Sequence, residues 1–124
     1  MKIVVYNPFK LWYNRSIKWK RKGNFMQISI TYKNQFGGTP FSAANVNCPQ
    51  SDIEEALEYA YRWTQNIMGS WSNKIGHDAN DNVEVLHFNN DGSGLRSSMV
   101  GDEFYIAETK QTFVCDSFGF KEIK

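Results

Sequence analysis

Cys115 and His87 are the two side chains whose chemistry would suit nucleophilic catalysis. A thiol becomes a strong nucleophile when an imidazole lies beside it and takes its proton. However, Cys115 follows Phe113 at a spacing of two in an apolar run, which predicts a small buried side chain rather than a reactive one. The serines between residues 93 and 98 stand in no hydrolase motif. The sequence therefore favours a protein that is not an enzyme.

The polar loop at residues 78–82 is the nearest approach to a metal site. Its acids and amides are similar to the start of a calcium loop, but Val83 stands where that loop requires glycine and Asn89 where it requires glutamate. The cysteines lack the paired spacing of a zinc site. The stretch at residues 91–94 has glycines but no phosphate-binding lysine, which predicts a turn. We expect neither a metal nor another cofactor.

Cations and aromatic rings alternate densely between residues 10 and 22, here called the basic aromatic segment. Lysine and arginine can neutralise phosphates, and tryptophan and tyrosine can stack on exposed bases. The same side chains make good anchors on an acidic protein surface. This segment is therefore the candidate binding surface of the chain. Its candidate binding residues are Lys10, Trp12, Tyr13, Arg15, Lys18, Trp19, Lys20, Arg21 and Lys22.

Four partners are compatible with this composition. Among external partners, a host protein is the leading expectation and nucleic acid is the runner-up. An anionic membrane surface also attracts tryptophan and lysine, but it is the least favoured of the four. The internal alternative, in which the cations pair with the acidic part of the same chain, is favoured slightly over any single external partner.

The acids and bases are divided along the chain. Residues 1–51 contain eight lysines and arginines and no acid, so they carry +8. Residues 52–124 contain six lysines and arginines and all thirteen acids, so they carry −7. Such asymmetry is typical of a chain with a charged interaction segment. The boundary falls at Asp52, the first acid.

Length and composition predict one globular domain. A chain of 124 residues with 15% aromatic residues can build a core without disulfides or metals. We see neither a membrane-spanning apolar run nor a secretory signal. Cys48 and Cys115 are expected to be reduced thiols, which favours the cytoplasm. Met26 is an alternative start, which would remove the basic aromatic segment and leave a net charge of −6.

The amino-terminal half predicts two strands and one helix. Residues 2–6 form a β-branched run, and residues 25–33 alternate apolar and polar side chains as a half-buried strand does. Ser51 is the expected N-cap of the helix, with Glu54 completing a capping box. Gly69 marks the helix stop. The apolar stripe of the helix is Ile53, Ala56, Leu57, Ala60, Trp63, Thr64 and Ile67.

The carboxy-terminal half predicts an antiparallel meander. Its strands are expected at residues 83–88, 103–108 and 112–117, with a hairpin turn at residues 109–111. Phe113, Phe118 and Phe120 are expected to pack against the helix stripe, together with the apolar face of the 25–33 strand.

The stretch Arg96-Ser97-Ser98-Met99-Val100-Gly101-Asp102, followed by a strand pair and Phe118-Gly119-Phe120, carries a resemblance. It resembles the tails of small phage and actinobacterial accessory proteins of unknown function. Trp63-Thr64-Gln65-Asn66 and Ser70-Trp71-Ser72 also look like that group, and the resemblance covers about residues 26–123. Met99 stands where the group often has serine. The resemblance implies no catalytic residues.

The same stretch has a physical interpretation that does not depend on the resemblance. Gly101 permits a positive φ before the next strand. Asp102 can accept hydrogen bonds from neighbouring amides in the turn. Both residues are therefore expected to act in folding.

Taken together, these features predict an α+β fold with one main amphipathic helix packed on a small, mostly antiparallel β-sheet. Residues 26–124 would form the single domain, and residues 1–25 a basic, aromatic-rich amino-terminal segment. The leading expectation for function is a non-enzymatic binding protein, a phage-encoded accessory or inhibitor factor that binds a host macromolecule. The alternative is a nucleic-acid-binding module that uses residues 10–22.

Overall fold

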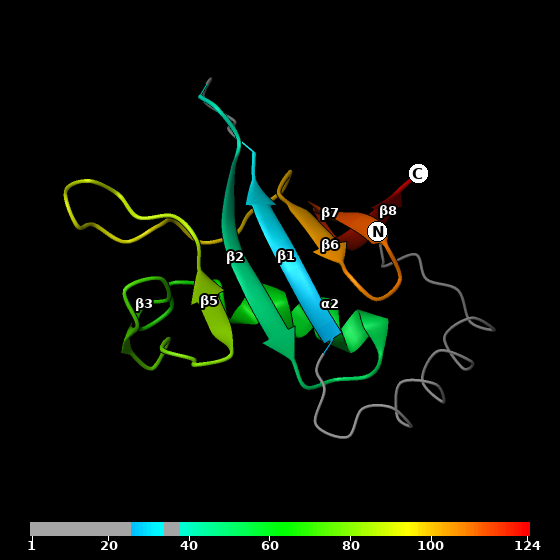
Figure 1. Cartoon of the computed structure of the whole chain (residues 1–124), viewed down its shortest axis with the longest axis horizontal. Coiled ribbons are helices and arrows are strands. Elements are labelled where there is room, and N and C mark those ends of the chain that lie inside the picture. Colours follow the sequence, from blue (N-terminus) through cyan, green and yellow to red (C-terminus); the bar gives the residue numbers. More distant parts are fainter. Residues whose placement is uncertain (1–25, 34–37) are drawn as a thin grey trace.

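The computed structural model describes residues 26–33 and 38–124, so the strand expected at residues 2–6 lies outside the described residues. In the described part, one helix packs on a six-stranded sheet, and two short strands form a second sheet (Figure 1). The predicted α+β class is confirmed, with strands dominating the fold. The elements are β1 (Met26–Tyr32), β2 (Phe41–Cys48), α2 (Ile53–Arg62), β3 (Gly69–Ser70), β4 (Ile75–Gly76), β5 (Val83–Val85), β6 (Glu103–Ile106), β7 (Gln111–Asp116) and β8 (Gly119–Ile123).

The sheet runs in the order β5-β2-β1-β6-β7-β8, and every neighbouring pair is antiparallel. The predicted meander is confirmed for β6 and β7, and the structure adds β8, which was not predicted. The prediction is wrong for the strand expected at residues 83–88. That strand is only β5, and it pairs with β2 at the opposite edge of the sheet. The chain between β5 and β6 therefore passes β2 and β1, from the edge strand β5 to the other half of the sheet.

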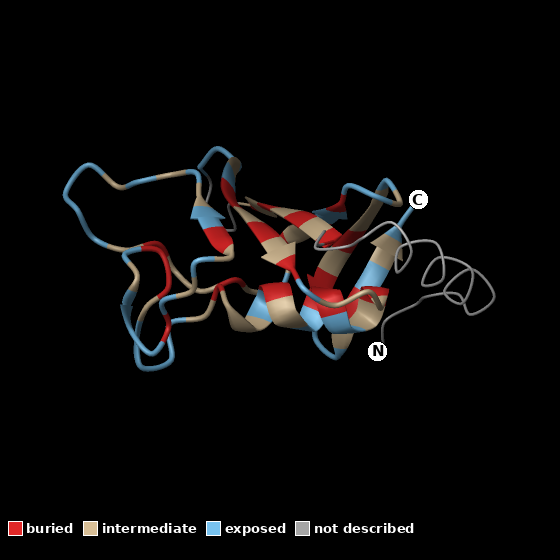
Figure 2. Cartoon of the chain, turned by 60° about the horizontal axis from the view of Figure 1, so that its bottom comes forward, coloured by how far each residue is buried: buried red, intermediate tan, exposed pale blue. Residues whose placement is uncertain are grey.

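The core lies between α2 and one face of the sheet. In Figure 2, buried and partly buried residues alternate along the central strands, and further buried residues lie in the helix beneath them. Met26, Ile28, Ile30 and Tyr32 of β1 are all at most 1% exposed, which confirms the strand and its apolar face. β1 can be fully buried on this face because it is a central strand with partners on both sides.

β2 was not predicted, because its sequence departs from simple alternation. Ala43 and Ala44 are adjacent and both buried. The pairing with β1 shifts by one residue here, since Ile30 faces Ala44 while Thr31 faces Ser42. A β-bulge of this kind inserts one unpaired residue and lets two neighbours point inward.

α2 starts and ends at different residues from those predicted. The N-cap is Asp52 and not Ser51, because the Asp52 carboxylate accepts the N–H of Glu55 at 3.2 Å. The helix ends at Arg62, well before the predicted stop. Beyond it, the Thr64 carbonyl accepts the N–H of Ser98 at 3.0 Å. This carbonyl is therefore bonded to a distant segment and not to a following turn of the helix.

The shortened helix changes the predicted stripe. Its first four members, together with Thr64, are fully buried, whereas Ile67 lies past the helix and is 60% exposed. In the described residues, no helix has the length and apolar character needed to cross a membrane.

A buried aspartate holds the turn at residues 96–102. The two carboxylate oxygens of Asp102 accept hydrogen bonds from both terminal nitrogens of Arg96, at 2.7 and 2.9 Å. They also accept the backbone N–H groups of Met99, at 2.8 Å, and Lys33, at 3.0 Å. Gly101 has a φ of +99°. The folding roles predicted for Gly101 and Asp102 are therefore confirmed.

The same turn is tied to β1 and to the region after α2. The Tyr32 hydroxyl donates to the Arg96 carbonyl at 2.9 Å, and the Arg96 guanidinium stacks 4.1 Å from the Tyr32 ring centre. Burial raises the pKa of Tyr32, which keeps this hydroxyl protonated as a donor. The Trp71 indole N–H donates to the same carbonyl at 2.9 Å, and the hydroxyls of Ser98 and Thr64 lie 2.7 Å apart.

Replacing Asp102 with alanine should destabilise the fold strongly. The change removes the carboxylate from the Arg96 guanidinium, which keeps only carbonyl acceptors, and leaves two amide N–H groups without their acceptor. The loss should be about 2–4 kcal/mol, given that Arg96 is partly exposed. Urea unfolding followed by circular dichroism measures it. Asp81→Ala, at an exposed loop position, is the control and should change stability by less than about 0.5 kcal/mol. Equal stability of the two variants would contradict the role given to Asp102.

Candidate functional site

The binding residues predicted from the sequence lie outside the described residues, so the structure assigns them no position. They are Lys10, Trp12, Tyr13, Arg15, Lys18, Trp19, Lys20, Arg21 and Lys22. The described part has a different candidate site, which sequence reasoning did not identify.

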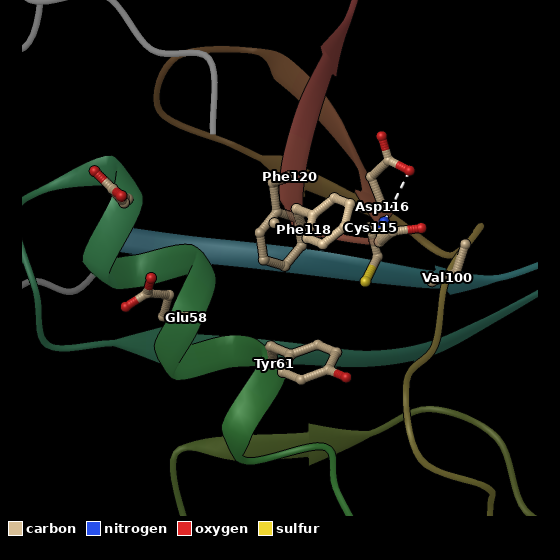
Figure 3. A pocket seen from close by; sticks show the side chains of 10 residues that line it. Glu58, Tyr61, Val100, Cys115, Asp116, Phe118 and Phe120 are labelled. Carbon is tan, nitrogen blue, oxygen red and sulfur yellow. Dashed lines mark hydrogen bonds between the residues drawn. The ribbon is translucent and has the colours of Figure 1, made fainter. Parts of the chain in front are cut away.

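This site is an open groove of about 410 Å³ between α2 and the hairpin that joins β7 to β8 (Figure 3). Glu54, Glu58 and Tyr61 line it from the helix. Residues 115–120 line it from the hairpin, and Val100 closes one end. The two sides come from segments more than fifty residues apart in sequence, so only the tertiary fold brings them together.

Helical spacing explains the wall contributed by α2. Glu54, Glu58 and Tyr61 are separated by four and three residues, so they follow one another along one helix face. The neighbouring face carries Ile53 and Leu57, which are fully buried against the sheet. Packing of that apolar face therefore turns the face with Glu54, Glu58 and Tyr61 towards the hairpin.

Aromatic rings form the floor and lip of the groove. Phe120 is buried and packs edge-on against Phe104, with ring centres 4.9 Å apart, and against Tyr61, at 6.2 Å. Phe118 is 77% exposed, so the prediction that it packs against the helix stripe is wrong. It lies in the turn before β8 rather than on a strand face, and Gly119 continues with a φ of +133°.

The groove is acidic. Glu54, Glu58 and Asp116 place three carboxylates along it, and none of its lining residues is a cation. The described ranges as a whole hold seven lysines and arginines against thirteen acids, a net charge of −6. Several of those cations are engaged elsewhere, as in the pairs of Arg62 with Asp78 at 3.2 Å and Lys33 with Glu103 at 3.4 Å.

The groove has no activated nucleophile. The Cys115 side chain points into it but is only 6% exposed. Burial and the nearby carboxylates of Asp102 and Asp116 raise the pKa of Cys115 to about 11, so the thiol stays protonated near neutral pH. His87 follows β5 at the far edge of the sheet and packs on Phe41, with ring centres 4.1 Å apart. Cys115 and His87 therefore do not meet.

The polar loop that was considered for calcium has a structural role. Asp78 is buried, and its carboxylate accepts the N–H groups of Ile67, at 2.8 Å, and Met68, at 2.7 Å, and pairs with Arg62. Burial by itself would raise the pKa of Asp78, but these hydrogen bonds outweigh it and lower the pKa. Asp78 thus anchors the chain entering the β3–β4 hairpin. Within the two described ranges, no three metal-ligating side chains come together.

The glycine-containing stretch at residues 91–94 is a turn, as predicted. Asp91 accepts the backbone N–H of Ser93 at 2.9 Å, and Gly92 has a φ of +84°. This is the side-chain-to-backbone bond that aspartate commonly makes in turns.

Comparison of the chain with protein-family models, curated proteins and solved structures finds no match.

Proposed function

We propose that this protein is a non-enzymatic binding protein and that the groove between α2 and the β7–β8 hairpin holds a segment of a partner protein. The observation that carries the proposal is the exposed Phe118 ring beside an aromatic floor and three carboxylates. The partner segment would place an apolar side chain among Tyr61, Phe118 and Phe120. Its lysines or arginines would lie against the acidic wall.

General properties of interfaces support this choice. An exposed large aromatic ring at the edge of a hollow is a common anchor of protein–protein contacts. Opposite charge around such an anchor guides association and rejects partners of the wrong sign. The net charge of −6 over the described ranges would repel a phosphate backbone, so the groove favours protein over nucleic acid.

The resemblance of the carboxy-terminal stretch adds a biological setting to the proposal. A phage-encoded accessory or inhibitor factor would meet its partner in the host, and we propose a host protein as that partner. The free thiols of Cys48 and Cys115 are compatible with the host cytoplasm, where thiols stay reduced.

A nucleic-acid-binding module is the second candidate, favoured by the dense cations and aromatic residues of the basic aromatic segment. Labelled single-stranded and duplex oligonucleotides, titrated at two salt concentrations, test it. Binding should weaken steeply as salt rises, because each phosphate contact releases counterions. Absence of binding at low salt would eliminate this candidate.

Removing the anchor of the groove should abolish capture of the partner protein. In affinity purification from the native host, Phe118→Ala should recover the partner at a level about ten-fold or more below that of the unchanged chain, as expected for loss of an interface hot spot. Glu54→Lys with Glu58→Lys should have the same effect through charge reversal. Phe88→Ala is the matched control, because Phe88 is 68% exposed but belongs to the loop after β5. Equal recovery with Phe118→Ala and Phe88→Ala would refute the proposal.

A further inference from the structure

The groove and the basic aromatic segment are chemically complementary. The groove has three carboxylates, no cation and an exposed aromatic lip. The segment has six cations, no acid and three large aromatic side chains within thirteen residues. We propose that the basic aromatic segment of the chain docks in its own groove, where it competes with the partner protein.

The path of the chain makes this docking feasible. The segment ends at Lys22, four residues before Met26, where β1 begins. Met26 pairs with Cys48, the last residue of β2, and α2 starts shortly afterwards at Ile53. The segment therefore joins the domain at the end of the sheet where α2 starts. Glu54, in the first turn of that helix, is the nearest acid of the groove along the chain.

The available length is sufficient. Four extended residues span about 13 Å, and the thirteen residues of the segment could extend a further 40 Å or so. α2, with ten residues, is about 15 Å long, so the segment can run along its whole acidic face. A tether this short gives an effective concentration in the millimolar range, so even weak contacts would keep the groove largely occupied.

Each chemical part of the segment has a counterpart in the groove. Its lysines and arginines would approach Glu54, Glu58 and Asp116. Trp12 or Trp19 would stack against Phe118 and Tyr61, which are 77% and 37% exposed. Contact with the segment would remove apolar ring surface from water. An external partner with the same chemistry would have to displace the segment first. The inference shares the groove with the proposed function, but its test does not require the partner.

A spin label on the segment tests the docking in the full-length chain. Ser16→Cys provides the attachment point. The unchanged chain, treated with the same reagent, shows whether the buried thiols of Cys48 and Cys115 also take up label. At low salt, the label should broaden the amide resonances of Glu58, Tyr61 and Phe118 at least three-fold more than those of Glu84 and Tyr105 on the other face of the sheet. The variant Glu54→Gln with Glu58→Gln should remove this difference.

The charge-matched control is Glu55→Gln with Glu84→Gln, which removes two carboxylates outside the groove. Broadening of the groove should persist in this control. Uniform broadening, or no broadening, would overturn the proposal. Broadening that appears only when labelled and isotope-enriched chains are mixed would show docking between two copies and would also overturn it. The proposed function fails separately, if capture of the partner does not depend on Phe118.

Discussion

The hydrogen bonds of Asp102 are the constraint on which much of the described fold depends. This carboxylate is fully buried, and it joins the Arg96 guanidinium to the amides of Lys33 and Met99. A buried charge of this kind is tolerated only when its acceptor sites are filled. These hydrogen bonds fix three segments relative to one another: the end of β1, the turn at residues 96–102 and the start of β6. The long connection across the sheet is thereby held at its carboxy-terminal end.

The groove is a consequence of this arrangement. α2 packs over β1 and β2, whereas β7 and β8 lie towards the other edge of the sheet. The hairpin side of the sheet is therefore only partly covered, and the gap is bordered by the helix face with Glu54, Glu58 and Tyr61. Val100, in the turn that Asp102 stabilises, borders the gap at one end. The same interactions that secure the core thus leave an aromatic and acidic hollow open to solvent.

Local patterns in the sequence predicted the elements that depend on local chemistry. β1 alternates cleanly because one of its faces is buried, and the α2 stripe has helical spacing up to Ala60. β2 could not be predicted, since its bulge places Ala43 and Ala44 inward together. The helix end could not be predicted either. Ile67 continues the helical spacing, but hydrogen bonds from the distant Ser98 to Thr64 replace the next helical turn.

The candidate site was harder to predict than the fold. The sequence predicts for Glu54 only a part in a capping box, and nothing local indicates that the β7–β8 hairpin lies beside Glu54 and Glu58. Phe118 was expected in the core because it is apolar and lies two residues before Phe120, a spacing that would place both side chains on one face of a strand. Its exposure follows from its place in the turn, which is a tertiary property. The basic aromatic segment, in contrast, could be recognised from composition alone.

We propose that the groove is the surface through which the protein contacts its partner. A photo-crosslinking amino acid placed at position 118, and separately at position 88, measures this directly in the native host. We expect position 118 to form covalent adducts with one host protein, at a peptide rich in lysine or arginine, and position 88 to form none with it. Adducts to that protein from position 88 alone would contradict a partner site in the groove.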